Sequence, residues 1–513
     1  MNETAAHDEM RYRQAIGGAS PCKTQFSSFL GRGILDNMLS LTTSIFGFLA
    51  AVPLVAAGSS PNVLYKDVVV VGGGASGAYA AVRIRDDFGK SIALIEKQDI
   101  LGGMVDSYTD PKTGKPYNFG VMTFLDAGNA TGFFDRFGIE TGSPSLISVN
   151  TEYIDFKTGN PVNFTLPPMA DQMAAMAKFL EIVEPWEHLM QPGYGNFPEP
   201  DAIPEDLLIP YGDFITKYGL EAAVPLMYES TGLGLGDMTK ETTMFVLQGF
   251  GASMARAMVG KQNQLAPASG RNQDLYDAIA EDLAGDVLYS STVIESHRSN
   301  SSVILIVKNH KTGETTRIHA RRLLLAIEPT AANMAPFDLD RNEKNVLSRF
   351  TYTNEYTGIV NNAAFAFNQS YFNLPPTAAP DNYLALPDAS FTARIDYIGG
   401  DDLFRVTIVG NSTLDTAGAK RLVQNDFNTL LRSGRLAKTS NGEPLSWVDF
   451  ATHGPMHARV SVADVKAGFF QKLNALQGGR STWWTGGAFS VNFQTTLWEF
   501  DELLFPELLK GLN

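Results

Sequence analysis

Three glycines near the start of the chain have the spacing of a nucleotide-binding turn. Gly72, Gly74 and Gly77 form a GxGxxG pattern directly after Val68 to Val71, a β-branched run typical of a buried parallel strand. The first glycine permits a tight turn and the second leaves room for a pyrophosphate, whose charge the free N–H groups of the following helix would bind. The pattern predicts a dinucleotide-binding site.

An acidic residue ends the next strand that the sequence predicts, Ser91 to Ile95. Glu96 follows the glycines by about 20 residues, the spacing at which a carboxylate accepts hydrogen bonds from ribose hydroxyls. Its charge would repel a 2′-phosphate, which argues against NADP. On its own, the stretch from Asp67 to Lys97 is compatible with either NAD or FAD.

The elements expected around this stretch are interrupted and then resumed along the chain. Helices are predicted over Met169 to Leu189 and Glu241 to Val259, with three methionines of the first on one face, and a helix and strands of the nucleotide-binding type return near residue 265. We therefore expect discontinuous domains: an N-terminal extension of residues 1–61, a nucleotide-binding domain of residues 62–145, 265–335 and 451–513, and a substrate domain of residues 146–264 and 336–450.

Charge and cysteine content argue against several classes of chemistry. The 513 residues carry 40 Lys and Arg against 55 Asp and Glu, a net charge of −15, which argues against a nucleic-acid partner. The only cysteine, Cys22, precedes an apolar run that a signal peptidase would remove. Disulfide redox chemistry, a cysteine nucleophile and iron–sulfur ligation are therefore not expected in the mature chain.

The N-terminal residues predict a targeting segment rather than part of the fold. No charged residue lies between Asp36 and Lys66, and an apolar run with a small-residue exit is typical of a secretory signal peptide near residues 38–58. If this segment is retained, it would anchor the protein to a membrane. Five glycosylation sequons mildly favour a secreted glycoprotein: Asn129, Asn163, Asn300, Asn368 and Asn411.

Several stretches, taken in order, resemble the flavin-dependent amine-oxidoreductase superfamily, and within it the fungal branch typified by β-cyclopiazonate dehydrogenase. The resemblance rests on VVVVGGGASG, ALIEKQDILGG, TDPKTGKPYNFGV and WWTGGAFS, and on the helix and strand that end at Val293. It implies an α/β fold, α+β overall, with a Rossmann-like FAD-binding domain of the amine-oxidase and glutathione-reductase type and a discontinuous substrate domain. It also implies FAD as the cofactor.

The resemblance further implies which residues would contact each part of FAD. Met104 departs from the superfamily, which often has Arg or His at this position. The implied contacts are Gly72, Gly74, Ala75, Ser76 and Gly77 at the pyrophosphate, Glu96 and the adjacent Lys97 at the adenosine ribose, Gly102, Gly103 and Met104 near the phosphates, Gly120, Val121 and Met122 by the isoalloxazine, Val293 at the adenine, and Gly486, Gly487 and Ala488 on the flavin side of the pocket.

No catalytic motif stands out, so the catalytic candidates are His453 and Trp484. Gly454 and Pro455 break any helix that would place His453 and His457 on one face, and no metal is therefore expected. His453 is interpreted either as a structural histidine or as a residue that faces the active site. Trp484 and its neighbour Trp483 would either form the wall beside the flavin ring or belong to an aromatic core.

The expected function is that of an FAD-dependent oxidoreductase, a dehydrogenase or an oxidase. It would abstract a hydride from an amine-type or allylic C–H of a small, largely apolar molecule, and oxygen or another acceptor would reoxidise the flavin. Two alternatives stay open: a flavin-dependent double-bond isomerase of unsaturated fatty acids, and a catalytically silent flavoprotein. The expected partners are the substrate and the electron acceptor, with no nucleic acid, and with a membrane only if the signal segment is retained.

Overall fold

The computed structural model describes residues 62–144, 147–400, 402–437 and 443–512. The signal segment expected near residues 38–58 lies outside these residues, as does Cys22. Within the described ranges, no helix has both the length and the apolar composition needed to cross a bilayer.

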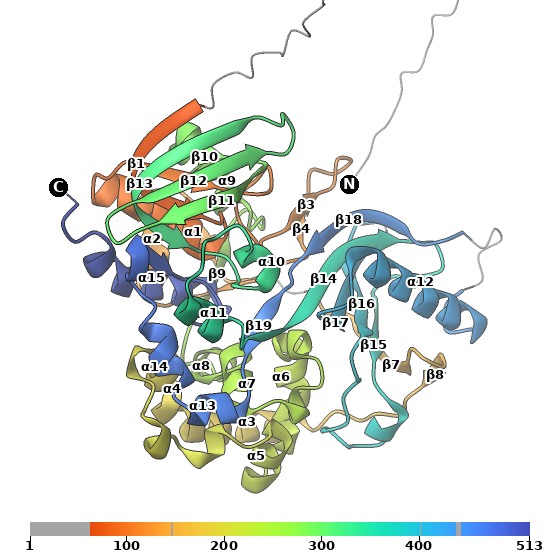
Figure 1. Cartoon of the computed structure of the whole chain (residues 1–513). Helices are drawn as coiled ribbons and strands as arrows, with labels where there is room; N and C mark the ends of the chain where they lie inside the picture. The colour runs from red at the N-terminus through yellow and green to blue at the C-terminus, as the bar shows by residue number, and fades with distance from the viewer. Residues whose placement is uncertain (1–61, 145–146, 401, 438–442, 513) are drawn as a thin grey trace, which may run out of the picture. The chain divides into compact units, whose positions relative to one another are not determined.

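The first sheet is organised around β1 (Asn62–Val71), whose four consecutive valines are buried. β1 pairs in parallel with β2 (Ile92–Ile95) on one side and with β13 (Thr315–Leu325) on the other. β20 (Thr482–Trp484) pairs in parallel with the end of β13. The strand order is β10-β2-β1-β13-β12-β11. The strands not yet named are β10 (Val287–Leu288), β11 (Ser291–Arg298) and β12 (Val303–Asn309). The sheet lies at the upper left of Figure 1.

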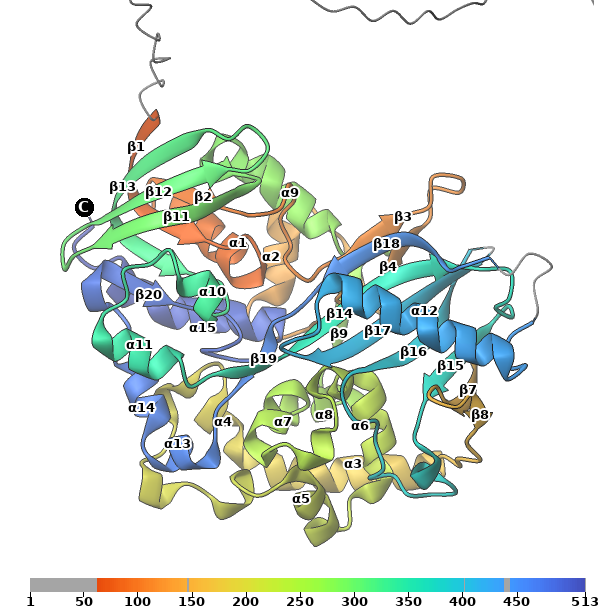
Figure 2. The same ribbon diagram turned by 45° about the vertical axis from the view of Figure 1, so that its right-hand side comes forward.

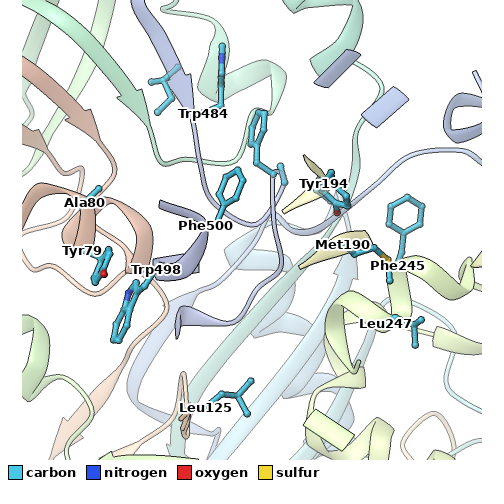
Figure 3. Close-up of a cluster of buried hydrophobic side chains, with 14 of the residues drawn as sticks. Tyr79, Ala80, Leu125, Met190, Tyr194, Phe245, Leu247, Trp484, Trp498 and Phe500 are labelled. Carbon is cyan, nitrogen blue, oxygen red and sulfur yellow. The ribbon is translucent and has the colours of Figure 1, made fainter. Parts of the chain in front are cut away.

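Three helices pack together beside this sheet. α1 (Ala75–Val82) contacts both α9 (Asp274–Leu283) and α15 (Gln494–Leu508). The aromatic contacts include Tyr79 of α1 stacked on Trp498 of α15, with ring centroids 5.3 Å apart. Figure 3 shows this part of the core, in which side chains from distant segments meet.

Helices α3 to α8 form a layer at the bottom of Figure 1. The two long helices expected here are both interrupted, the first by a 3₁₀ turn at Glu184–Trp186 that contains Pro185, and the second at Phe250 and Gly251. Met176 is buried but Met169 is exposed, so the methionines do not form one continuous core face. The helices are α3 (Met169–Val183), α4 (Glu187–Met190), α5 (Tyr211–Tyr218), α6 (Val224–Ser230), α7 (Thr243–Gly249) and α8 (Ala252–Met258).

The second sheet has the order β18-β14-β17-β16-β15-β7-β8, and β19 pairs with β14. Because β18 spans residue 451 and β19 follows it, this sheet continues past residue 450, where the sequence placed the end of the substrate domain. Its strands are β7 (Asn150–Asp155), β8 (Asn160–Pro161), β14 (Thr351–Asn361), β15 (Gln369–Asn373), β16 (Phe391–Gly399), β17 (Leu403–Asn411), β18 (Ser446–Thr452) and β19 (Met456–Arg459).

The two faces of this sheet differ in character. α12 (Thr416–Arg432) lies along one face, where Phe404, Val406 and Ile408 pack with Val423 and Phe427 (Figure 2). The opposite face, called the inner face below, lies toward α6 and the 3₁₀ turn Gly232–Leu235. Because side chains alternate along a strand, Thr357, Asp396 and Arg405 lie on the inner face, together with apolar residues such as Phe372 and Val409.

The remaining elements are short. They are β3 (Ser107–Thr109), β4 (Pro116–Asn118), β5 (Phe124–Leu125), β6 (Thr141–Gly142), β9 (Gln264–Pro267), α2 (Ala130–Arg136), α10 (Ala331–Met334), α11 (Arg341–Leu347), α13 (Val462–Lys466) and α14 (Phe469–Asn474).

Candidate active site

The carboxyl ends of four parallel strands meet at one edge of the first sheet. β1 leads into the glycine turn, β2 into Glu96, β13 into Glu328, and β20 into Gly486. In sheets of this kind, ligands bind outside the carboxyl ends of the strands, where the connections diverge. The expected dinucleotide site therefore lies at this edge.

The glycine turn is built from close backbone approaches. Gly72 has a φ of +104°, and a side chain there would begin 2.5 Å from the carbonyl oxygen of Ala326. A Cβ on Gly77 would overlap the carbonyl oxygen of Gly72. A Cβ on Gly103 would lie 2.9 Å from the Cα of Gly74, so the second glycine segment is stacked directly on the first.

The start of α1 offers unsatisfied donors. Gly74 is the N-cap and supplies no side chain to cap the helix, so the N–H groups of the first turn are free for a ligand. The hydroxyl of Ser76 is buried and has no hydrogen-bond partner among the residues that the structure describes. Free N–H groups, a positive helix end and an orphaned hydroxyl fit the pyrophosphate of FAD.

Glu96 is held rigidly beside this turn. Its Oε2 accepts a hydrogen bond from the Gly73 N–H at 2.6 Å, and its Oε1 accepts one from the Gln98 N–H at 2.8 Å. The side chain of Lys97 points to solvent. Ser291 donates its N–H to the Glu96 carbonyl at 2.9 Å, which brings buried Val293 to the same region. The arrangement fits a carboxylate that binds the ribose.

We expect Glu96→Gln to weaken FAD binding by about 10- to 100-fold, because a hydrogen bond to a charged group contributes about 1.5–3 kcal/mol. The dissociation constant is measured by titrating FAD with the apoprotein and following the change in flavin fluorescence. Asp99→Asn is the matched control, because Asp99 is exposed and pairs with Lys311 at 2.8 Å. Equal affinities for the two variants would contradict a role of Glu96 in binding.

The segment expected beside the isoalloxazine forms a small hydrogen-bonded unit. Gly102 donates its N–H to the Gly73 carbonyl at 2.9 Å, and Val121 donates its N–H to the Met104 carbonyl at 3.1 Å. A Cβ on Gly120 would overlap the same Met104 carbonyl, which explains the glycine there. The two segments of residues 102–104 and 120–122 therefore lie side by side next to the glycine turn.

The inner face of the second sheet contacts this segment. Thr357 of β14 donates its hydroxyl to the Phe119 carbonyl at 2.7 Å. Arg405 of β17 places Nη1 3.1 Å from the sulfur of Met122. His453, in the loop between β18 and β19, is buried with Nε2 2.6 Å from Oδ2 of Asp106. His453 thus contacts the segment expected to line the flavin, and it is also fixed there by an acidic partner.

An ion cluster that the sequence analysis missed occupies the inner face. Oδ2 of Asp396 lies 3.0 Å from both Nη2 of Arg405 and Nε of Arg394. Burial opposes ionisation of Asp396, but the two arginines hold its pKa below the usual value. One signal was present in the sequence: Arg394 and Asp396 alternate with Ile395 and Tyr397 in an otherwise apolar strand.

A row of polar side chains runs from the edge of the first sheet to the inner face of the second. We call Glu328, Asn492, His457 and Glu355 the polar row. Asn492 Oδ1 and Glu328 Oε1 both lie against Gly487, where a Cβ would come 2.8 Å from Glu328. Asn492 Nδ2 is 3.3 Å from His457 Nδ1. His457 Nε2 and the Glu355 carboxylate lie together over Gly234, where a Cβ would overlap the carboxylate.

The ionisable groups of the polar row have shifted pKa values. Burial lowers the pKa of His457 to about 3, so its ring is neutral. Because Asn492 donates to Nδ1, the ring proton of His457 lies on Nε2. Burial raises the pKa of Glu355, opposed by His453, Arg394 and Arg405. Within the described ranges, no three His, Cys, Asp or Glu side chains gather as metal ligands.

The C-terminal segment separates into a core part and a site part. Trp484 is fully buried and stacks on Phe489, with ring centroids 5.9 Å apart. Figure 3 shows its place in the core. Trp483 is also buried, with the guanidinium of Arg322 5.5 Å from its ring centroid. The structure thus assigns both tryptophans to the core, while Gly486, Gly487 and Ala488 follow at the strand edge.

Comparisons with known proteins bear on this site. A family model described as an NAD(P)-binding Rossmann-like domain matches residues 70–137. An FAD-dependent oxidoreductase of Monascus ruber is 31% identical over 458 residues, which cover 88% of this chain and 94% of that protein. This chain belongs to the FAD-dependent oxidoreductases. The β-cyclopiazonate dehydrogenase of Aspergillus flavus is 29% identical to this chain, over 86% of this chain and 93% of the dehydrogenase.

Solved structures share the fold of this FAD-dependent oxidoreductase. A conjugated linoleic acid-producing fatty acid isomerase of P. acnes aligns with a TM-score of 0.65 at 17% identity, over 86% of this chain and 98% of that one. Putrescine oxidase aligns with a TM-score of 0.57 at 15% identity, over 87% of this chain and 99% of that one. The fold class, the family and the FAD cofactor expected from the sequence are confirmed, while the individual FAD contacts stay predictions. When bound, FAD would supply a two-electron acceptor beside these segments.

Proposed function

We propose that this FAD-dependent oxidoreductase removes a hydride from an amine-type or allylic C–H bond of a small, largely apolar molecule. The observation that carries the proposal is the contact of the inner face with residues 104–122, made by Thr357, Arg405 and His453. It supports a substrate site between the second sheet and the edge where FAD is expected to bind. A few polar groups among apolar walls would orient a small molecule there.

The chain's own residues suit an amine-bearing substrate. Glu355 is half-buried beside a neutral histidine on the inner face, and its carboxylate would accept a hydrogen bond or an ion pair from a substrate nitrogen. The fold shared with putrescine oxidase and cyclohexylamine oxidase is compatible with this choice. Oxygen or another oxidant would then restore the flavin.

Anaerobic mixing of the purified holoenzyme with a panel of amines, allylic compounds and unsaturated fatty acids tests the proposal. We expect an amine or allylic compound to bleach the flavin absorption band, and admission of oxygen or an artificial acceptor to restore it. Glu355→Gln should raise the amine concentration that gives half-maximal bleaching. The control is Glu152→Gln, because Glu152 of β7 lies on the α12 side of the second sheet, where it pairs with Arg435 just beyond α12 at 3.2 Å.

Two results would contradict the proposed function. A shifted double bond in a fatty acid without net bleaching would favour the isomerase alternative, for which the structural similarity to a fatty acid isomerase is the specific observation. Absence of bleaching and of product with every compound would favour the catalytically silent flavoprotein. Equal bleaching by Glu355→Gln and Glu152→Gln would remove Glu355 from the substrate site.

A further inference from the structure

Glu328 lies at the edge where the parallel strands end, just beyond β13. The carbonyl oxygen of Ala326, two residues before it, is in contact with the Gly72 turn. The Oε1 atom of Glu328 lies against Gly487, in the C-terminal segment that follows β20. Glu328 therefore sits between two of the glycine segments that surround the expected FAD position.

The carboxyl group of Glu328 is only partly satisfied. It accepts a hydrogen bond from the Ala488 N–H. Its Oε2 is inaccessible to solvent and has no partner in the part of the chain that the structure describes. A buried carboxylate oxygen without a partner is unfavourable unless the group is protonated or a ligand reaches it. Oε2 is thus available to a proton or to a bound molecule.

Several titratable groups face Glu328 from neighbouring elements. They are Tyr352 of β14, Tyr194 of the helical layer and, through Asn492, His457 of β19. Burial raises the pKa of both tyrosines far above neutral and lowers that of His457 to about 3. Burial raises the pKa of Glu328 to about 8. Of these four groups, Glu328 is the one that changes its protonation state near neutral pH.

We propose that Oε2 of Glu328 accepts the proton that leaves the substrate during oxidation. This inference rests on the proposed function. The C–H bond of the substrate breaks and its hydrogen leaves with both electrons to FAD. The proton on the adjacent atom, a carbon or a nitrogen other than the one that Glu355 would hold at the far end of the polar row, goes to Glu328. A double bond forms between the two substrate atoms, and the carboxylate becomes a neutral carboxylic acid that later releases its proton to solvent.

The test compares the wild type, Glu328→Gln and Asp426→Asn as holoproteins. Asp426 is a matched control because burial raises the pKa of its carboxyl to about 7 as well, while it lies on α12, on the opposite side of the second sheet. Without substrate, the visible spectrum of the bound flavin should titrate with a midpoint near pH 8 in the wild type and in Asp426→Asn. Glu328→Gln should lose this titration, because a nearby negative charge no longer forms.

With a substrate identified by anaerobic mixing, the rate of flavin reduction adds a second readout. In the wild type, the rate should rise with pH through about 8, because only the ionised carboxylate accepts a proton. Glu328→Gln should lose this rise and reduce its flavin about 10²- to 10⁴-fold more slowly above pH 8, with little change in KM. Glu328→Asp should keep a pH-dependent rate with a shifted midpoint.

Each outcome decides between two explanations. If Glu328→Gln keeps the wild-type spectral titration and pH profile, the proposal is overturned. If it does not accumulate as a holoprotein, Glu328→Asp takes its place, and an unchanged midpoint in that variant overturns the proposal equally. If no substrate bleaches wild-type flavin but the spectral titration depends on Glu328, the proposed function fails while the placement of Glu328 beside the flavin stands.

Discussion

Gly77→Ala should yield a protein that purifies with little or no FAD. A Cβ on Gly77 would overlap the carbonyl oxygen of Gly72, and both groups are fixed in backbone, so α1 must move away from the turn. Its N–H groups would then no longer converge on the pyrophosphate. Overpacking of this kind also costs about 1–3 kcal/mol of stability. The ratio of flavin absorbance to protein absorbance and the thermal midpoint measure both effects.

Gly285→Ala is the matched control for this substitution. Gly285 belongs to the same lobe, and a Cβ there would meet no described atom within 4 Å. It should retain full FAD content and an unchanged thermal midpoint. Full FAD content in Gly77→Ala would show that the helix start does not bind the pyrophosphate as the structure indicates.

Arg298→Met should lower the free energy of unfolding by about 3 kcal/mol, at the lower end of the range for a broken buried ion pair. The Arg298 side chain is fully buried, with Nη2 2.7 Å from Oε2 of Glu343 and Nε 3.0 Å from Oδ1 of Asp338. Its loss leaves Glu343 buried with a weaker partner, Arg480, at 3.5 Å. Because this contact with Arg480 remains, we expect a loss at the lower end of the range for a broken buried ion pair. Chemical denaturation of the holoprotein measures the change.

Two further variants sharpen this result. Lys510→Ala removes an exposed pair with Glu507 and should change the free energy of unfolding by at most about 1 kcal/mol. Adding Glu343→Met to Arg298→Met should restore part of the lost stability, because it removes the unpaired charge. A loss below about 1 kcal/mol in Arg298→Met alone would mean that water or Arg480 already compensates the buried carboxylates.

Much of the first sheet was predictable because its signals are local. Four buried valines, glycines at fixed spacing and an acid at the end of the next strand all lie within one stretch of the sequence. The resemblance extended that stretch to the family and to FAD, and the comparisons confirm both. The helical layer was predicted less well, because a proline and a glycine interrupt patterns that remain periodic across the break.

Trp484 shows how one motif separates in space. The sequence WWTGGAFS reads as a unit, yet β20 joins the first sheet and buries the indole while the glycines that follow it reach the strand edge. The choice between core and flavin wall depended on whether the tryptophans lie inside a strand. Strand pairing with β13 decides that, and no local signal reports it.

The sequence by itself determined the nucleotide-binding half of this protein, because neighbouring residues build the turn and its physical requirements are local. Only the tertiary structure decided the substrate half. His453 meets Asp106 across 347 positions of the chain, and Arg405 meets Met122 across 283. Such contacts depend on the register of β14, β16 and β17 and on the burial of charges between two sheets. Glu328 is the clearest case, since only the meeting of β13 and β20 at one edge places its carboxyl group beside Gly487.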